Sequence, residues 1–178
     1  MNKIICSICL NPDKCYSDYF NNIITSLAKK YNTYSFSPHL TIYGVIRAPQ
    51  KDIEEAIKYA FADIQKFCLN TVKLDYSGKF TKTLYIQFAI NNILTSIHKR
   101  LNQKLSRYLI NCKEYNLNPH ISLIYKRDLS VNEKERVIKN IELKSEFVFD
   151  SYSIITASKP IEIEEDVKSF KEVYKRSF

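Results

Sequence analysis

Glycine is scarce in this sequence, with 2 residues in 178, and tryptophan is absent. Neither the GxGxxG pattern of dinucleotide-binding folds nor the GxxxxGK[ST] pattern of P-loop proteins occurs, so nucleotide binding of those kinds is not expected. The apolar stretch Ile4–Leu10 is too short for a signal-peptide core or a membrane span. We therefore expect a cytoplasmic protein without a membrane partner.

Neither sign of charge is confined to one part of the chain. The formal net charge is +8, and the excess of lysine and arginine over acidic residues is similar in the two halves. Such a balance is typical of a solvated surface, but it also favours an anionic ligand such as RNA or a nucleotide. Hydrophobic residues make up 45% of the chain, which is ordinary for a globular protein. At this length, residues 1–178 form a single domain with a sizeable core.

The cysteines do not form a regular framework. There are five of them, Cys6, Cys9, Cys15, Cys68 and Cys112. Cys6 and Cys9 have CxxC spacing, but they lie in an apolar run and no second CxxC follows. A zinc or redox site is therefore disfavoured, and we expect free, buried thiols in a reducing compartment.

Hydrophobic periodicity predicts alternating helices and strands. The expected helices are Cys15–Lys30, Asp52–Phe67 with Asp52 as N-cap, Asn91–Leu109, and Val131–Ile141 after Ser130. The expected strands are Lys3–Leu10, His39–Ile46, Leu69–Tyr76, Thr83–Ala89, His120–Tyr125, Glu146–Thr156, Ile161–Ile163 and Ser169–Phe178, the last with a helix as the alternative. A hairpin through 77–79 is expected to join the third and fourth strands. This mixture predicts an α+β sandwich.

A short pattern occurs twice and contains two of the three histidines. The copies are Ser37-Pro38-His39-Leu40-Thr41-Ile42-Tyr43-Gly44 and Asn118-Pro119-His120-Ile121-Ser122-Leu123-Ile124-Tyr125. Both read small polar, proline, histidine, aliphatic, hydroxyl, aliphatic. Each copy follows a predicted helix, so the chain is expected to form two similar lobes that face each other across a groove. No low-complexity linker separates the two lobes.

Alternation along a strand places the reactive side chains of each copy on one face. His39, Thr41 and Tyr43 share a face, as do His120 and Ser122, while the aliphatic residues point to the core. One neutral imidazole can remove a proton from an attacking water or hydroxyl, and one protonated imidazole can donate a proton to the leaving oxygen. The hydroxyls can donate hydrogen bonds to phosphate oxygens. The pair therefore suits a phosphodiester.

Either histidine alone has a simpler interpretation, because a single histidine on a half-buried strand is usually a packed residue. A metal pair is disfavoured because two histidines are an incomplete ligand set, and no Asp or Glu occurs between positions 32 and 51 or between 115 and 127. No cysteine lies in either copy to act as a nucleophile. We treat His98, which is followed by Lys99 and Arg100, as a surface residue.

The paired His39-Leu40-Thr41 and His120-Ile121-Ser122 resemble the two-histidine (2H) phosphoesterase superfamily, and most closely its cyclic-phosphodiesterase group. The resemblance implies a bilobed, pseudo-two-fold symmetric α+β fold with a central groove and metal-independent chemistry without a cofactor. It also implies that His39 and His120 are catalytic. In that group a tyrosine five residues after the second histidine helps to bind phosphate, and Tyr125 occupies this position. On a straight strand Tyr125 would face away from His120, so this role requires a bulge or the end of the strand.

The expected function is hydrolysis of a 2′,3′-cyclic phosphate on a nucleotide or RNA end by a monomer. His39 and His120 share the acid and base roles, Thr41, Ser122 and Tyr125 bind phosphate, and further substrate contacts are expected from Tyr43, Tyr85 and Lys126. Tyr43 and Tyr85 could instead be core residues, and Lys126 a solvated one. Two alternatives stay open: a phosphodiesterase for 2′-5′-linked or cyclic oligonucleotides, and a non-catalytic RNA- or nucleotide-binding module.

Overall fold

The computed structural model describes residues 3–110, 114–159 and 161–178. Its strands are β1 (Lys3–Pro12), β2 (Leu40–Pro49), β3 (Phe67–Tyr76), β4 (Leu84–Phe88), β5 (His120–Ile124), β6 (Glu146–Thr156) and β7 (Lys171–Ser177). Its α-helices are α1 (Lys14–Lys30), α2 (Gln50–Ala60), α3 (Asn92–Leu105) and α4 (Val131–Lys139). Short 3₁₀ helices cover Phe80–Lys82, Ser106–Tyr108 and Glu164–Ser169. The α+β class is confirmed.

Local capping explains why three of the helices begin where they do. The Asp13 side chain accepts from Tyr16 N at 3.0 Å at the start of α1, and the Asn91 side chain accepts from Leu94 N at 2.9 Å at the start of α3. Ser130 and Glu133 form a capping box at α4, and this helix begins after Ser130 as predicted. These bonds satisfy backbone donors that have no partner within a helix.

Two predicted elements differ from the structure. Helix α2 begins directly after Pro49 and ends at Ala60, so Asp52 is not its N-cap, and Phe67 begins β3 instead of ending the helix. Aromatic packing overrides helical periodicity here, because the ring of Phe61, just past the end of α2, stacks on Tyr152 with the centroids 4.2 Å apart. Asp52 instead accepts hydrogen bonds from Arg107 and Tyr108.

The second difference lies near the C-terminus. Residues 161–163 do not form a strand, and a 3₁₀ helix follows them. The Asp166 carboxylate accepts from the backbone N–H groups of Glu162 and Ile163, at 3.0 and 3.1 Å, and so occupies donors that a ladder would need. The predicted hairpin after β3 is also longer than expected, because the 3₁₀ helix Phe80–Lys82 lies within it.

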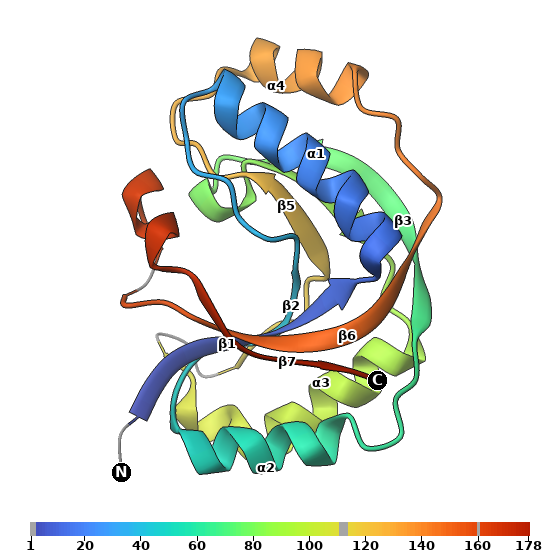
Figure 1. Ribbon diagram of the computed structural model, residues 1–178, viewed down its shortest axis with the longest axis vertical. Helices are drawn as coiled ribbons and strands as arrows, with labels where there is room; N and C mark the ends of the chain where they lie inside the picture. Colours follow the sequence, from blue (N-terminus) through green and yellow to red (C-terminus); the bar gives the residue numbers. More distant parts are fainter. Residues whose placement is uncertain (1–2, 111–113, 160) are drawn as a thin grey trace.

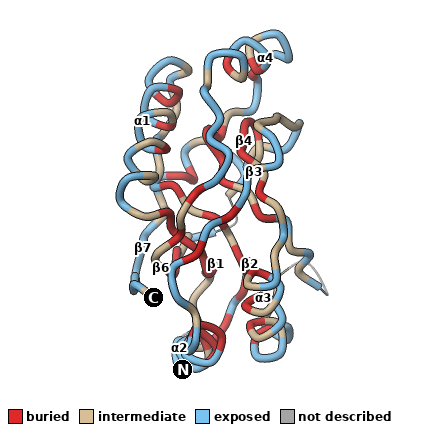
Figure 2. The backbone as a smooth tube through the Cα atoms, turned by 90° about the vertical axis from the view of Figure 1, so that its right-hand side faces the viewer, coloured by how far each residue is buried: buried red, intermediate tan, exposed pale blue. Residues whose placement is uncertain are grey.

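All seven strands join one antiparallel sheet with the order β1-β2-β5-β4-β3-β6-β7. Strand β6 also pairs with β1, so six of the strands form a closed circuit of pairings. Helices α1 and α4 contact β5 and β3 at one end of the molecule, and α2 and α3 contact β2 at the other (Figure 1). Figure 2 shows that buried positions gather on the strands and on the sides of the helices that face them. The two predicted lobes correspond to these two ends.

The two motif strands meet at the centre of this arrangement. Leu40 of β2 is the register partner of Ile121 of β5, and each of these residues directly follows a motif histidine. Helix α1 leads into β2 but packs on β5, whereas α3 precedes β5 but packs on β2. The pseudo-symmetry expected from the repeat therefore appears as an exchange of helices between the lobes. None of the helices over the described residues has the length and apolar character needed to cross a membrane.

Candidate active site

His39 and His120 line the same cavity, which has a volume of about 340 Å³. His39 lies immediately before β2, and His120 is the first residue of β5. The antiparallel pairing of Leu40 with Ile121 brings the two motifs together from opposite directions. The cavity is also lined by Thr41, Gly44 and Tyr125 from the motifs. Its other walls come from Ile5, Cys6, Ser7, Cys9, Val45, Thr81, Tyr115, Ile155, Ala157, Lys159, Ile161 and Phe170.

The two imidazoles are held in the same way. Nδ1 of His39 bonds to the carbonyl oxygen of Ser37 at 2.7 Å, and Nδ1 of His120 bonds to the carbonyl oxygen of Asn118 at 2.7 Å. A carbonyl oxygen can only accept, so each Nδ1 carries a proton and each Nε2 is left for proton transfer. The buried prolines between these partners, Pro38 and Pro119, restrict the backbone that presents each carbonyl.

Burial favours the neutral form of both histidines. It lowers the pKa of His39 below its ordinary value of 6.5, and the bond to Ser37 only partly offsets this. Burial lowers the pKa of His120 to about 4, and the positive charges of Lys82, His39 and Lys79 act in the same direction. Among the described residues, no cation acts on His39 in this way. The site is therefore electrostatically asymmetric although its hydrogen bonds are symmetric.

Lys82 is the cation most closely built into the surroundings of His120. Its ammonium donates to the Gln87 and Asn118 side chains at 3.0 and 3.1 Å, and it lies 3.9 Å from the ring centroid of Tyr85. The Tyr85 ring in turn contacts His120 edge to face, with the centroids 5.8 Å apart. Lys82 has no acidic partner among the ion pairs of the described residues. Its charge is thus available to an anion in the site.

The two motif hydroxyls differ. Thr41 lines the cavity, and its side-chain oxygen has the Cys9 thiol as a neighbour at 3.8 Å. Ser122 is buried and does not line the cavity; its hydroxyl donates to the Thr81 carbonyl at 2.7 Å. Thr41 can therefore donate to a bound anion directly, whereas Ser122 would first have to leave Thr81.

Tyr125 lies beyond the end of β5, which is a position from which it can bind phosphate together with His120. Strand β5 ends at Ile124, and Tyr125 comes just after that end and lines the cavity with His120. Its ring stacks on Phe36 with the centroids 4.3 Å apart, and its hydroxyl is hydrogen-bonded to that of Ser122. Burial raises its pKa well above the usual range, so the phenol stays protonated and remains a donor.

Tyr43 does not line the cavity, contrary to the prediction. It is fully buried, and its hydroxyl donates to Asn102 of α3 at 2.9 Å. The β1–β2 pairing shifts register on both sides of Tyr43, because Ile8 pairs with Tyr43 while Cys9 pairs with Thr41. The pairing leaves two extra residues in β2, one on each side of Tyr43, and they break the alternation on which the shared face of Thr41 and Tyr43 depended.

The other two predicted contacts also lie outside the cavity lining. Tyr85 is buried and its hydroxyl donates to Asp75 at 3.2 Å, so it supports His120 from behind and does not offer a free stacking face. The Lys126 ammonium pairs with Glu164 at 3.6 Å. Arg127, which follows it, donates to the Glu162 carbonyl. Lys126 thus binds the first residue of the 3₁₀ helix Glu164–Ser169, and Arg127 binds the segment before it.

Several cavity residues are not marked by any pattern in the sequence. Phe170 and Lys159 come from the C-terminal segment, and Tyr115 comes from the loop before β5. Lys82 reaches His120 because β4 pairs with β5, which no local pattern encodes. His98 is half-buried, not a surface residue: its Nε2 bonds to the Tyr115 carbonyl at 2.9 Å.

The thiols agree with the sequence prediction in part. Cys6 and Cys9 are free and buried, and burial raises the pKa of each to about 12, so both stay protonated. Cys15 and Cys68 are free but exposed, and Cys112 lies outside the described residues. Within the described ranges, no group of three or more His, Cys, Asp or Glu side chains is placed to share a metal ion.

Comparisons with known proteins agree with this geometry. The family model described as "2'-5' RNA ligase superfamily" matches residues 22–158. The crystal structure of E. coli LigT in apo form superposes with a TM-score of 0.60 at 10% identity, covering 99% of this chain and 98% of that chain. A crystal structure titled only as a phosphoesterase gives 0.59 at 10% identity with the same coverage.

A comparison with curated protein sequences gave no match. The solved structures are too distant in sequence to show more than the fold, but the family model covers most of the chain and spans both histidine motifs. The chain therefore belongs to the 2′-5′ RNA ligase superfamily of two-histidine phosphoesterases, and it is an enzyme of the phosphodiesterase type.

Proposed function

We propose that the protein hydrolyses 2′,3′-cyclic phosphates on nucleotides or RNA ends by acid–base catalysis with His39 and His120. One observation carries the proposal: both imidazoles have Nδ1 fixed by a backbone carbonyl and line the same small cavity. Two proton-transfer groups on one phosphate are what an in-line displacement needs, because one oxygen must lose a proton while another gains one. Each transfer typically contributes about 10²- to 10⁴-fold in rate.

The reaction consumes one water per cyclic phosphate. The neutral imidazole takes a proton from the water as its oxygen bonds to phosphorus. The bond from phosphorus to one ribose oxygen breaks, and that oxygen receives a proton from the protonated imidazole. The product is a phosphate monoester on the other ribose oxygen, and the two histidines have exchanged protonation states, which solvent restores.

The charges around the site favour His120 as the base and His39 as the acid. Lys82, Lys79 and a protonated His39 all oppose a proton on His120, so the first proton to enter the pair resides on His39. The bound phosphate then stabilises that imidazolium by its negative charge. This division of roles also selects the direction of ring opening, because the leaving ribose oxygen must lie on the His39 side.

Thr41 and Tyr125 hold the phosphate in this proposal. Both line the cavity, and both present a hydroxyl that stays protonated near neutral pH. Such donors stabilise the charge that develops on the non-bridging oxygens during the displacement. The E. coli LigT structures include complexes with phosphate and with 3′-AMP, which supports a nucleotide phosphate as the ligand of this fold.

A turnover assay in EDTA tests the proposal. The purified protein is incubated with 2′,3′-cyclic nucleotides and, in parallel, with 2′-5′-linked oligoadenylates. We expect hydrolysis of the cyclic nucleotides and its loss in His39→Ala and His120→Ala. Turnover of the oligoadenylates alone would replace the proposed substrate by the alternative one. Loss of activity in EDTA, with recovery on adding a divalent cation, would contradict the metal-free mechanism. The monomeric state and the cytoplasmic location stay predictions.

A further inference from the structure

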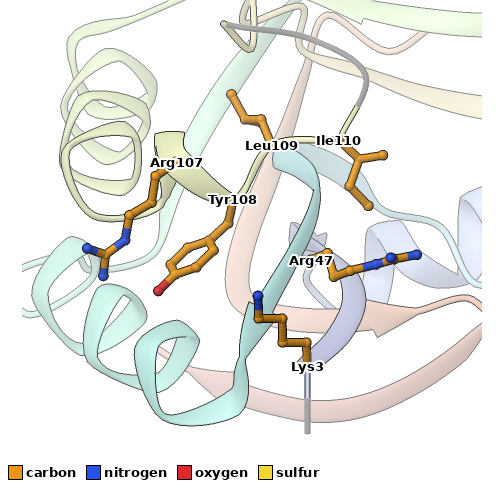
Figure 3. Close-up of a pocket in the computed structure, with 6 residues that line it drawn as sticks. All are labelled: Lys3, Arg47, Arg107, Tyr108, Leu109 and Ile110. Carbon is orange, nitrogen blue, oxygen red and sulfur yellow. The ribbon is translucent and has the colours of Figure 1, made fainter. Parts of the chain in front are cut away.

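A second cavity, of about 770 Å³, lies on the β1–β2 ribbon beyond the histidine site. Lys3 of β1, Arg47 of β2 and Arg107 of the 3₁₀ helix Ser106–Tyr108 line it, together with Tyr108, Leu109 and Ile110 (Figure 3). Three cations from three separate elements thus border one hollow. No role for any of them follows from the two-histidine chemistry.

Most of this positive charge is not neutralised within the protein. Arg107 pairs with Asp52 at 3.3 Å, and the Tyr108 hydroxyl donates to the same carboxylate. Neither Lys3 nor Arg47 takes part in any ion pair among the residues that the structure describes. Both side chains are exposed. The hollow therefore carries an excess of positive charge. A bound anionic ligand would reduce the repulsion between these cations.

The basic hollow and the histidine cavity share one strand surface. Ile5 and Val45 line the histidine cavity, and Arg47 is the register partner of Ile5. Val45 and Arg47, two residues apart, are both exposed while Ile46 between them is buried, so they lie on the same face about 7 Å apart. Lys3 and Ile5 are likewise two residues apart and lie on the same face of β1. The floor of the active site thus continues directly into the basic hollow.

The segment Arg107–Ile110, which forms one side of the basic hollow, is hydrogen-bonded to β2. Ile46 forms an antiparallel bridge with Leu109, and Ile110 N donates to the Val45 carbonyl at 2.9 Å. These bonds hold the segment that carries Arg107 and Tyr108 along the edge of the strand. The β1 partners of Thr41 and Arg47 are Cys9 and Ile5, which are four residues apart, so the ribbon rises about 13 Å from the site to Arg47.

We propose that Lys3, Arg47 and Arg107 form a distal phosphate-binding subsite for the backbone of an RNA chain whose cyclic-phosphate end lies at the two histidines. In Figure 3, Arg107 and Arg47 lie on either side of Lys3, so the cations are spread along the hollow and do not converge on one point. A spread of this kind fits successive phosphates of a chain better than a single phosphate group. The inference rests on the proposed function, and it adds that oligonucleotide ends are preferred over mononucleotides.

Two substrates distinguish an effect on the distal subsite from an effect on the catalytic site. One is a 2′,3′-cyclic mononucleotide, and the other is an oligoribonucleotide that ends in a 2′,3′-cyclic phosphate. The variants are Lys3→Gln/Arg47→Gln, which breaks no ion pair of the described structure, and the triple variant that adds Arg107→Gln. The matched control, Lys14→Gln/Lys66→Gln/Lys139→Gln, removes as much charge from exposed positions on α1, on the segment before β3 and on α4, respectively.

In the triple variant we expect kcat/KM for the oligoribonucleotide to fall about 10- to 100-fold, while kcat/KM for the mononucleotide changes less than about twofold. The double variant shows a smaller fall in the same direction. The slope of log Kd for the oligoribonucleotide against log salt becomes shallower by about 0.7 per lost phosphate contact, here about 2 in the triple variant. The control variant behaves as wild type for both substrates.

Equal effects of the triple and control variants, or equal effects on both substrates, would overturn the subsite. So would a similar loss of binding to phosphatidylserine vesicles, because it would identify an anionic membrane as the partner. Failure of the proposed function looks different: wild type would then cleave neither substrate, yet fluorescence anisotropy would still show oligoribonucleotide binding that the triple variant weakens.

Discussion

The two histidine half-sites have the same backbone design and different electrostatic surroundings. Each begins with a buried proline, fixes Nδ1 on the carbonyl two residues earlier at 2.7 Å, and continues into a strand with a buried aliphatic residue. The surroundings of the rings differ. His39 lies against aromatic rings, Phe36 and Phe170, with centroids 6.1 and 6.0 Å away. His120 lies against Tyr85 and near Lys82.

The hydroxyls follow the same division. Thr41 in the first half-site is open to the cavity, whereas Ser122 in the second is bonded to Thr81 and to Tyr125. Tyr125 lines the cavity in place of Ser122, and its hydroxyl exchanges the bond to Ser122 for one to a bound phosphate. A repeated motif can therefore supply two identical proton-transfer groups while neighbours from elsewhere in the fold assign them opposite roles.

The largest expected effect tests whether both half-sites act. His39→Ala and His120→Ala should each lower kcat/KM for a 2′,3′-cyclic nucleotide by about 10²- to 10⁴-fold, because each removes one proton transfer. His98→Gln is the control, since it replaces the third histidine by another side chain able to hydrogen-bond and should stay within a few fold of wild type. If only one motif variant lost activity, the two-histidine account would be wrong.

The hydroxyls should show the asymmetry directly. Thr41→Val should lower kcat/KM about 10- to 100-fold, because it removes a donor to a charged phosphate at nearly constant shape. Ser122→Ala should have a smaller effect on kcat/KM and should instead lower the free energy of unfolding by about 1 kcal/mol, since it leaves the Thr81 carbonyl without its donor. Urea denaturation measures the second effect. Equal kinetic losses with unchanged stabilities would contradict the comparison.

Tyr125→Phe should have a smaller effect again. The ring can keep its stacking on Phe36, so the loss of the hydroxyl should raise KM about two- to tenfold and leave kcat within a few fold. Steady-state kinetics with the cyclic nucleotide checks this. An unchanged KM together with a large fall in kcat would mean that the phenol takes part in the chemical step, not in holding the phosphate.

The smallest effect concerns the charge beside His120. Lys82→Met removes a positive charge that opposes protonation, so the pKa of His120 should rise from about 4 toward its ordinary value. Titration of the imidazole resonances by NMR measures it, with Lys139→Met on the exposed face of α4 as the control. A pKa that fell, or that moved equally in the control, would show that Lys82 does not set the difference between the half-sites.

Patterns local in the sequence predicted much of the site, and long-range pairing determined the rest. The motif pair and the Ser130 helix start depend on neighbouring residues, and both appear as expected. Tyr43 was misplaced because an irregular stretch of β2 breaks strict alternation. Lys82 and Phe170 could not be predicted, since they reach the cavity region only through the β4–β5 pairing and the C-terminal segment beside β6. Lys126 was misassigned because its acidic partner lies far along the chain.

The pH dependence of kcat/KM for wild type, His39→Ala and His120→Ala tests the central claim most directly, namely that the half-sites perform opposite proton transfers. Activity needs a neutral His120 and a protonated His39. It should therefore fall below about pH 4, where His120 gains a proton, and fall again as pH rises through the pKa of His39, which lies below 6.5.

We predict a bell-shaped profile for wild type, loss of the acidic limb in His120→Ala, and loss of the basic limb in His39→Ala. A flat wild-type profile from about pH 5 to 9, or a complete bell in both variants, would contradict the account.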